Sequence, residues 1–208
     1  MNRNRVLRSD EGWDWITLAV RSNSPDTPVM DVVLHDAGRS RRLILGRLMH
    51  YRQSAPFAKI TLDLVSDVLD VPAGCSLVDV DVRGLEAVCG YLGIRLDLRR
   101  SSQISFKLSG PSHPGAWAPA VSAAVGGDEY LNPPGGAGLF VVSEFKELGI
   151  TPLLCHTTSF KYLSGPYTFQ EDLSILDALM WCSPNQIVDY LHSAVVSPLA
   201  DVEEVKVA

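Results

Sequence analysis

A segment rich in proline and glycine, residues 132–140 with the sequence NPPGGAGLF, is the clearest candidate for binding chemistry in this chain of 208 residues. It lies between a strand-like and a helix-like segment, where peptide N–H groups favour a phosphate, a carboxylate or a developing oxyanion. Asn132, Gly135 and Gly136 are therefore candidate substrate-binding residues. The segment matches neither G-x-G-x-x-G nor G-x-x-x-x-G-K-[ST]. An ordinary turn that needs these residues only for its backbone shape is the alternative.

Amide and guanidinium side chains alternate at the start of the chain, in Asn2, Arg3, Asn4 and Arg5. Two guanidinium groups with interleaved carboxamides supply many hydrogen-bond donors to an anion or a carbonyl group. These four residues are therefore candidate substrate ligands. A solvated, disordered terminus is the alternative explanation.

Ser174 and Asp177 have the S-x-x-D spacing that starts many helices, in which each side chain accepts a hydrogen bond from a peptide N–H group. This capping role explains both residues without chemistry. The functional alternative makes Asp177 a catalytic carboxylate, and Ser174 enters as a candidate substrate ligand only with the family resemblance given below.

Cys155 and His156 place a thiol beside an imidazole. Neighbouring side chains of a strand point to opposite faces, so these two cannot act together as a thiolate and its base. A buried core thiol is the simpler interpretation of Cys155. His156 alone stays a candidate base that faces a pocket.

The overall composition excludes several classes of protein. Lysine and arginine number 18 against 24 aspartates and glutamates, which gives a formal net charge of −6 and predicts no dominant attraction to nucleic acid. The four cysteines and five histidines lack C-x-x-C and H-x-x-x-H spacing, so we expect reduced thiols and no metal site. The sequence shows no signal peptide and no membrane-spanning run, which predicts a cytoplasmic protein.

Helix-like and strand-like segments alternate along most of the chain. Apolar periodicity predicts helices over residues 40–54, 59–71, 76–94, 115–127 and 139–150, and a C-terminal helical pair over 173–195, with Gly93 as a C-terminal cap. Alternation and β-branched residues predict strands over 13–20, 29–36, 95–105, 129–131 and 151–157. Strands separated by helices predict an α/β fold, with a mainly parallel or mixed sheet flanked by helices, in one domain over residues 1–208.

Several stretches, in this order, resemble the WbqC-like protein family of bacteria over nearly the whole chain. They are NRNRV followed by WDWITLAV, YRQSAPF, VCGYLGI before SSQIS, YLNPPGGAGLF with EFKELGI, Tyr162 ahead of Phe169, and DLSILDALM. The resemblance implies an association with gene clusters for O-antigen, other cell-surface glycans and specialised metabolites. Carried over to this chain, the family pattern implies functional roles for Asn2, Arg3, Asn4, Arg5, Ser102, Gly135, Gly136, Tyr162, Ser174 and Asp177.

This chain differs from the family pattern at two places. Family members begin with a strand, a His-Gln-Pro-x-Tyr-x-Pro segment and an Asp-Asp stretch, whereas Met1 here directly precedes Asn2. If the family's chemistry needs that histidine, we expect this chain to be a fragment, to carry a misplaced start, or to lack the usual activity. The sequence HPGAW at residues 113–117 replaces a plain helix start, which predicts an accessible loop position for His113.

The resemblance implies an acyl or aminoacyl transferase that forms an amide or ester on an amino sugar or small metabolite, in lipopolysaccharide or specialised-metabolite biosynthesis. We expect no bound cofactor, an acyl thioester of coenzyme A or a carrier protein as donor, and a small molecule, nucleotide-sugar or carrier protein as partner. His113, His156 or Asp177 would act as the base, and the peptide N–H groups of residues 132–138 would stabilise the oxyanion. The alternative is a non-catalytic module that binds a ligand or carrier without turnover.

Overall fold

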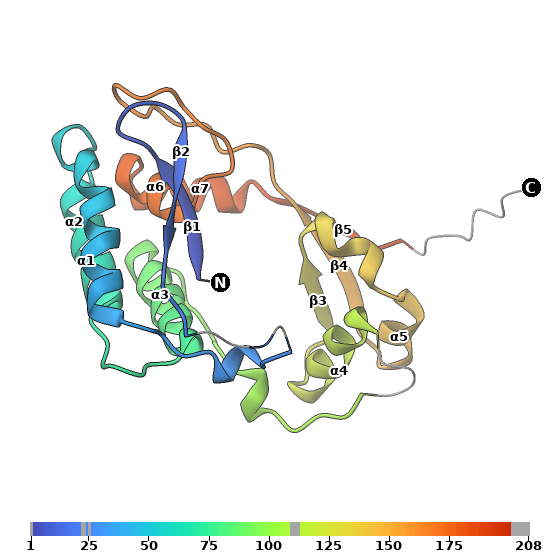
Figure 1. Cartoon of the computed structure of the whole chain (residues 1–208). Coiled ribbons are helices and arrows are strands. Elements are labelled where there is room, and N and C mark those ends of the chain that lie inside the picture. Colours follow the sequence, from blue (N-terminus) through green and yellow to red (C-terminus); the bar gives the residue numbers. More distant parts are fainter. Residues whose placement is uncertain (1, 22–23, 25, 109–112, 201–208) are drawn as a thin grey trace, which may run out of the picture. The chain divides into compact units, whose positions relative to one another are not determined.

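The computed structural model of the chain describes residues 2–21, 24, 26–108 and 113–200. Two compact units account for the chain (Figure 1). Unit 1 comprises Met1–Leu96 and Ser159–His192, and unit 2 comprises Asp97–Thr158 and Ser193–Ala208. The single domain expected over residues 1–208 stays a prediction.

Unit 1 begins with a β-hairpin. Strand β1 (Arg3–Leu7) pairs antiparallel with β2 (Trp13–Thr17), and Asn4 lies opposite Ile16. Because successive side chains of a strand point to opposite faces, Asn4 and Ile16 share the inner face of the hairpin. The strand β2 confirms the prediction over residues 13–20. The strand β1 replaces the disordered terminus that was the alternative explanation of the first residues.

The outer face of the hairpin carries two cation–π pairs. The guanidinium carbon of Arg3 lies 4.5 Å from the ring centroid of Trp15, and that of Arg5 lies 5.3 Å from Trp13. The two tryptophan rings meet edge to face, with their centroids 5.4 Å apart. Such pairs add a modest stabilisation at exposed positions. The arginines therefore stiffen the hairpin on the side away from the core.

Five α-helices complete unit 1. They are α1 (Ala37–Leu48), α2 (Ala58–Val68), α3 (Leu77–Leu92), α6 (Ile175–Trp181) and α7 (Pro184–His192). Helix α1 contacts β2 and α2, α6 contacts β1 and α2, and α3 contacts α2 and α7. The core between them contains the fully buried residues Leu34, Leu48, Tyr51, Leu179, Met180 and Ile187. All five helices overlap segments where the sequence predicts helix, although α1 begins before the segment predicted over 40–54 and that segment ends as a 3-10 helix (Met49–Gln53).

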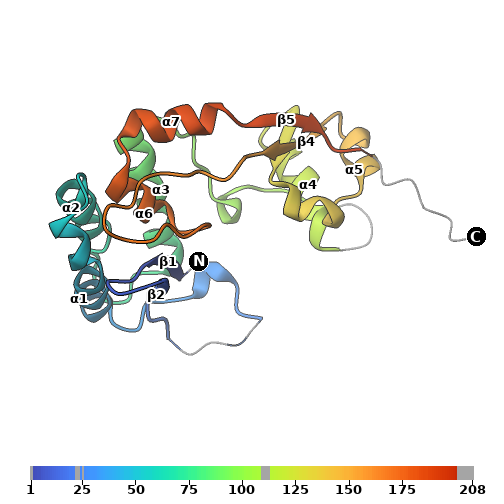
Figure 2. The ribbon, with the colours of Figure 1, turned by 90° about the horizontal axis from the view of Figure 1, so that it is seen from above.

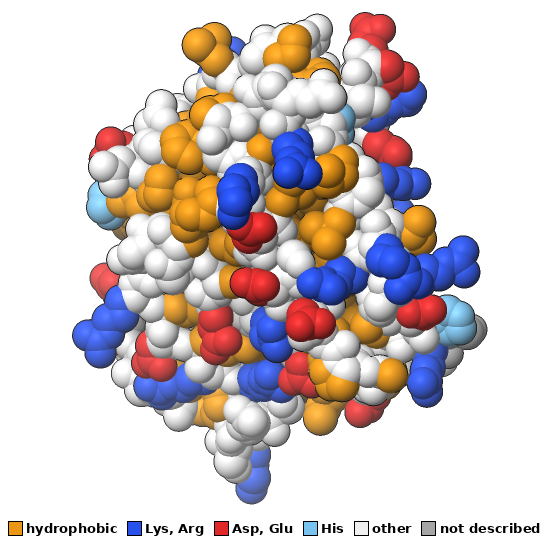
Figure 3. All heavy atoms as spheres, turned by 90° about the vertical axis from the view of Figure 1, so that its left-hand side faces the viewer, with side chains coloured by type: hydrophobic (Ala, Val, Ile, Leu, Met, Phe, Trp, Pro, Cys, Tyr) orange, Lys and Arg blue, Asp and Glu red, His pale blue; other side chains and the backbone are white. Residues whose placement is uncertain are grey.

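The outer surface of α1 and α2 mixes charged side chains with exposed apolar ones (Figure 3), among them Leu43 and Ile60. Figure 3 shows acidic and basic side chains interspersed over this face. Lys59 and Asp63, one turn apart on α2, form an exposed ion pair of 2.6 Å. Exposed pairs of this kind contribute little to stability. The folding of α1 and α2 therefore depends on their inner apolar faces.

Unit 2 contains a three-stranded mixed sheet with the order β3-β4-β5 (Figure 1), and Figure 2 shows β5 beside β4. Strand β3 (Glu129–Asn132) pairs parallel with β4 (Thr151–His156), and helix α5 (Val142–Glu147) lies between them in the chain. Strand β5 (Val195–Pro198) pairs antiparallel with β4. A further helix, α4 (Trp117–Ala124), precedes β3. Parallel strands joined by a helix are the predicted arrangement, and with β5 the sheet is mixed. The α/β fold class is confirmed.

Two predicted strands are wrong. Residues 29–36 contain a 3-10 helix (Val29–Asp31) and two isolated bridges, Val33 with Ser76 and Val20 with Leu34. Residues 95–105 form no strand and contain a 3-10 helix (Ser101–Gln103). Alternating polarity and β-branched residues indicate that side chains would fit a pleated sheet surface. A strand forms, however, only where a neighbouring strand pairs with its backbone. No described strand pairs with either segment along its length.

The end of α3 depends on one glycine. Gly93 adopts the left-handed conformation (φ 70°, ψ 20°), and its N–H group donates to the carbonyl of Gly90. We expect Gly93→Ala to lower the free energy of unfolding by about 1–2 kcal/mol, because a Cβ atom disfavours this conformation. Gly90→Ala, inside the same helix, should raise it by up to about 1 kcal/mol. Urea denaturation of the full chain measures both, and a Gly93→Ala variant as stable as the wild type would contradict the expectation.

Candidate functional site

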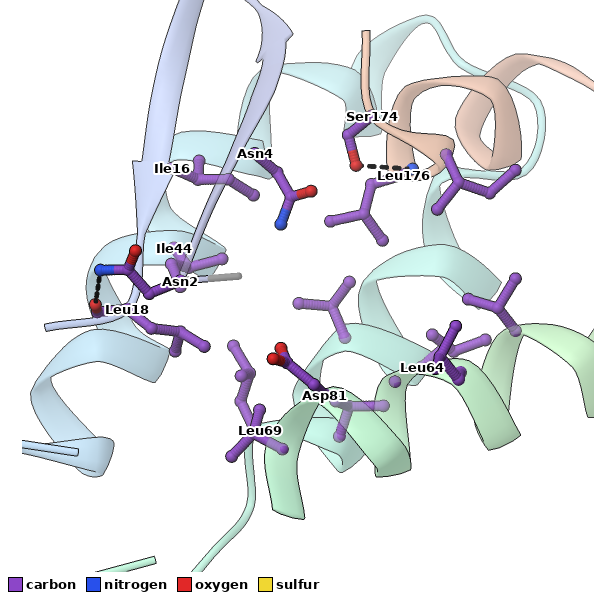
Figure 4. A pocket seen from close by; sticks show the side chains of 17 residues that line it. Asn2, Asn4, Ile16, Leu18, Ile44, Leu64, Leu69, Asp81, Ser174 and Leu176 are labelled. Carbon is purple, nitrogen blue, oxygen red and sulfur yellow. Dashed lines mark hydrogen bonds between the residues drawn. The ribbon is translucent and has the colours of Figure 1, made fainter. Parts of the chain in front are cut away.

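Unit 1 contains a cavity of about 510 Å³, open to solvent, between the hairpin and helices α1, α2, α3 and α6 (Figure 4). Its wall is mostly aliphatic and includes Ile16, Ile44, Val65, Val68 and Leu176. Small-molecule sites have volumes of roughly 300–1,000 Å³, apolar walls and a few polar groups. The cavity therefore has the size and the lining of a ligand site.

Helix periodicity explains why the wall is apolar. On α3, Val80, Gly84 and Val88 are spaced by four residues, so they share one face, and all three line the cavity. Leu64 and Val68 of α2 line it with the same spacing. Each helix thus presents part of its apolar face to the cavity and the rest to the core.

Four polar side chains interrupt this wall: Asn2, Asn4, Asp81 and Ser174. The carboxamide of Asn2 donates to the carbonyl of Leu18 at 3.1 Å, and the hydroxyl of Ser174 accepts from the N–H of Leu176 at 3.2 Å. The carboxamide of Asn4 has no hydrogen-bond partner within the part of the chain that the structure describes. Figure 4 shows Asn4 of β1 and Asp81 of α3 pointing into the cavity from opposite sides. Among the described lining residues, Asp81 is the one ionisable group.

A buried carboxylate, that of Asp177, lies in the first turn of α6, the helix whose N-cap Ser174 lines the cavity. Asp177 is 1% exposed, and its two oxygens accept hydrogen bonds from the hydroxyls of Tyr51 and Tyr162, the latter at 2.6 Å. The hydroxyl oxygen of Tyr51 in turn accepts from the N–H of Leu7 at 2.9 Å. Buried polar groups are stable only when they are hydrogen-bonded, and this network supplies every partner of the carboxylate from within unit 1.

The charges of this network perturb the ionisation of its members. Burial raises the pKa of Asp177, and the hydrogen bonds from Tyr162 and Tyr51 oppose that rise. Burial and the nearby Asp177 raise the pKa of both tyrosines, so both hydroxyls remain protonated donors. Burial, together with Asp177, also raises the pKa of Cys182 to about 11, so this thiol is not a thiolate near neutral pH.

The predicted capping box is present only in part. Ser174 is the N-cap of α6, and its hydroxyl accepts from the N–H of Leu176. Asp177 bonds the two tyrosines instead of the helix start. The carboxylate therefore joins α6 to Tyr51 and Tyr162 within unit 1. The assignment of Asp177 as a catalytic residue stays a prediction.

The Asn-Arg-Asn-Arg motif divides between the two faces of the hairpin. Asn2 and Asn4 line the cavity. Arg3 and Arg5 lie on the outer face, where Arg5 also donates to the carbonyl of Asp172 at 2.5 Å. Strand geometry makes this division unavoidable, because neighbouring residues cannot face the same cavity.

The two predicted histidine bases of unit 2 each bond to a neighbouring group of that unit. His113 caps the 3-10 helix Pro114–Ala116: its Nδ1 accepts from the N–H of Gly115 at 3.2 Å, and its Nε2 lies 2.9 Å from Glu144. With Nδ1 an acceptor, Nε2 carries the proton and donates it to the carboxylate. Both ring nitrogens are thus occupied in a half-buried setting, whereas a general base needs an available lone pair. His156, at the end of β4, has its Nε2 2.9 Å from the Ser197 hydroxyl.

The proline and glycine segment is a 3-10 helix (Pro134–Leu139). The carboxamide of Asn132 donates to the carbonyl of Pro133 at 2.8 Å, and the N–H of Gly136 donates to the same carbonyl at 3.3 Å. The N–H of Gly135 has no protein partner among the described residues, so this segment offers one exposed peptide donor. Ser102 is exposed in the 3-10 helix Ser101–Gln103. The roles predicted for Gly135, Gly136 and Ser102 stay predictions.

Sequence reasoning missed Asp81 and Gly84. Both lie on the cavity face of α3, and the available signal was a glycine within an otherwise apolar helix stripe. Within the described residues, no group of three or more His, Cys, Asp or Glu side chains could hold a metal ion. No helix in the same part of the chain is both long and apolar enough to cross a membrane.

The fold is that of a mixed α/β protein, and its helical unit contains a cavity of about 510 Å³. A family model for the WbqC-like protein family matches residues 1–189. The chain therefore belongs to the WbqC-like protein family. No curated protein and no solved structure matches it significantly.

The hydroxyl of Tyr51 holds two buried groups, the N–H of Leu7 and the carboxylate of Asp177. We expect Tyr51→Phe to lower the free energy of unfolding by about 2–4 kcal/mol, because both groups lose a partner while buried. The control Tyr91→Phe removes a part-buried hydroxyl that has no partner among the described residues, and we expect a change under about 0.5 kcal/mol. Urea denaturation of both variants is the measurement. Equal changes in the free energy of unfolding would show that the hydrogen bonds of the Tyr51 hydroxyl do not stabilise the fold.

The raised pKa of Asp177 predicts a pH dependence. A native pKa above the unfolded value of about 3.9 means that the folded state binds this proton more tightly, so stability from Asp177 falls as the pH rises through the native pKa. Asp177→Asn removes this dependence. The free energy of unfolding of the variant, relative to the wild type, should therefore rise between about pH 4 and pH 8. Urea titrations across that range test it, and a difference that stays constant or falls would contradict it.

Proposed function

We propose that this WbqC-like protein is an acyl or aminoacyl transferase that forms an amide or ester on an amino sugar or small metabolite, with the transferred group in the cavity of unit 1. The observation that carries the proposal is the cavity itself, whose apolar wall is interrupted by the carboxamide of Asn4 and the carboxylate of Asp81. An acyl group has the matching character, since it joins an apolar chain to a polar carbonyl group.

The two polar groups suit the charges that develop in acyl transfer. The attacking amine nitrogen forms a bond to the acyl carbon, the C–S bond of a thioester donor breaks, and the thiolate leaves. In this proposal the side-chain carboxamide N–H of Asn4 donates to the carbonyl oxygen of the acyl group as that oxygen becomes an oxyanion. The carboxylate of Asp81 accepts the proton lost by the amine. Asp81 takes the place of the bases expected from the sequence, because it points into the cavity.

The setting of the reaction follows from the family resemblance. An amino-sugar acceptor agrees with the association of the family with cell-surface glycans, including lipopolysaccharide. A thioester of coenzyme A or of a carrier protein is the proposed donor, and the cytoplasm is the proposed location. These assignments concern the substrates and leave the roles of Asn4 and Asp81 unchanged.

The test is Asp81→Asn, which keeps the shape of the side chain and removes the proton acceptor. With an acyl-coenzyme A series and glucosamine as substrates, we expect product formation to fall at least about 100-fold. Glu86→Gln is the matched control, since Glu86 is an exposed carboxylate of the same helix outside the cavity, and this variant should keep wild-type turnover. Mass spectrometry of the product measures both. Equal turnover of Asp81→Asn and the wild type would remove Asp81 from the mechanism.

A non-catalytic binding module is the second candidate function. The geometry of the bases expected from the sequence favours it: both ring nitrogens of His113 and both oxygens of Asp177 bond to protein groups. Such a protein would bind an acyl compound or carrier in the same cavity without turnover. Saturable binding of the acyl-coenzyme A series with no product at any acceptor concentration would select this function over the transferase.

A further inference from the structure

The outer face of the β1–β2 hairpin presents two guanidinium groups that form no ion pair with a carboxylate of the described residues. Arg3 and Arg5 are two residues apart on β1, so their side chains leave the strand on the same face, with roughly 6–7 Å between their Cα atoms. Both contact tryptophan rings, and Arg5 also donates to the backbone carbonyl of Asp172. Since the whole chain has a net charge of −6, this pair of cations does not follow from a generally basic composition.

The one acidic residue within the two strands has a different partner. Asp14 lies between Trp13 and Trp15 on β2, so its side chain points to the face opposite the two rings. Its carboxylate accepts from the N–H of Trp15 at 2.7 Å and pairs with Arg47 of α1 at 3.1 Å. This carboxylate therefore does not neutralise the two cations of the outer face.

Stacking on the tryptophan rings prepares both guanidiniums for an anion. The guanidinium carbon of Arg3 lies 4.5 Å from the ring centroid of Trp15, and that of Arg5 lies 5.3 Å from Trp13. A guanidinium that lies over a ring uses its flat face for this contact and keeps the N–H groups in its plane for hydrogen bonds. The contact also restricts a long side chain, which therefore loses less freedom when a ligand binds. Planar N–H pairs of this kind match the oxygens of a phosphate group.

The outer face also exposes an aromatic ring beside the two cations. Trp13 is 39% exposed, whereas tryptophan is highly buried on average. Proteins that bind single-stranded nucleic acid combine such rings with basic side chains, and they stack bases on the rings because every base has a flat face. The net charge of the chain argues against a nucleic acid polymer. A single nucleotide has the same two features, a flat base and negatively charged phosphate groups.

We propose that the outer face of the hairpin binds a nucleoside diphosphate, with its two phosphate groups at Arg3 and Arg5 and its base on the exposed ring of Trp13. The two phosphates match the two guanidiniums in number and in charge. The site lies on the face of the hairpin opposite the cavity and uses neither Asn4 nor Asp81. It therefore goes beyond the proposed function and does not depend on it.

The probes are adenosine diphosphate, inorganic pyrophosphate and adenosine, in a buffer without divalent cations. We expect the full chain to bind adenosine diphosphate at least about 10-fold more tightly than either of the other two, because only this compound engages the cations and the ring together. Isothermal titration calorimetry measures the three affinities. An affinity for adenosine diphosphate no higher than that for adenosine or for pyrophosphate would overturn the proposal.

Substitution of the arginines locates the phosphate groups. Arg3→Gln and Arg5→Gln should each weaken the binding of adenosine diphosphate and of pyrophosphate at least about 10-fold. Arg42→Gln is the matched control, since Arg42 is an exposed arginine of α1 outside the hairpin and its loss changes the net charge by the same amount. This control should keep both affinities within about 2-fold. An equal loss in the control would show a general effect of charge and overturn the site.

Substitution of the exposed ring locates the base. Trp13→Leu should weaken the binding of adenosine diphosphate at least about 10-fold and leave pyrophosphate binding within about 3-fold, because the base alone loses its partner. A purely structural role of the hairpin would lower both affinities together. If Arg3→Gln does not fold, Arg3→Lys, which keeps the charge and loses the planar N–H pair, must show the same loss in a smaller degree.

Two kinds of compound contain a nucleoside diphosphate, coenzyme A and nucleotide-activated sugars. Titration of the wild type and of Arg3→Gln with coenzyme A and with a uridine diphosphate sugar distinguishes them. Binding that depends on Arg3 and is tighter for one of the two supports the site and assigns it to that compound. Binding of neither compound would overturn the site.

The outcomes separate this inference from the proposed function. Loss of adenosine diphosphate binding in Arg3→Gln and Arg5→Gln, without any acyl transfer by the wild type, supports the site and removes the transferase. Acyl transfer that depends on Asp81, with adenosine diphosphate affinity unchanged in both arginine variants, supports the transferase and overturns the site.

Discussion

The buried carboxylate of Asp177 is the constraint on which the architecture of unit 1 depends. A carboxylate that is 1% exposed loses its hydration, and this loss is tolerable only if protein donors replace the water. Tyr51 and Tyr162 are those donors, from positions 126 and 15 residues away in the sequence. The chain must therefore bring the 3-10 helix after α1 and the segment before α6 to one point, and Leu7 of β1 joins them through the Tyr51 hydroxyl.

This anchoring network also fixes the cavity. Asp177 lies in the first turn of α6, so holding it in place holds Ser174, Ile175 and Leu176 in the cavity wall. The hydrogen bond from Leu7 fixes the far end of β1, whose earlier residues Asn2 and Asn4 line the same cavity. A polar network that is fully hydrogen-bonded rigidifies its surroundings. The network thus holds in place residues that line the cavity, although none of its own members lines it.

Side chains alternate along β1, so the two faces of the hairpin have different partners. Its inner face gives the cavity the carboxamides of Asn2 and Asn4, and its outer face stacks Arg3 and Arg5 on tryptophan rings. The motif that looked in sequence like one cluster of donors is two sets of side chains with different partners. The amides line the cavity, while the guanidiniums stabilise the strand that presents them.

Local patterns in the sequence determined the helices, the cap at Gly93 and the parallel β3-α5-β4 unit, because periodicity, caps and short connections act between neighbouring residues. They also placed Asn2 and Asn4 among the candidate ligands, the family resemblance added Ser174, and these three line the cavity. Tertiary structure alone decided that residues 29–36 and 95–105 form no strand, because a strand exists only where another pairs with it. It alone decided that Asp177 bonds two distant tyrosines and that Asp81 shares a cavity with Asn4. Neither contact leaves a trace in the spacing of the sequence, since each joins residues that only packing brings together.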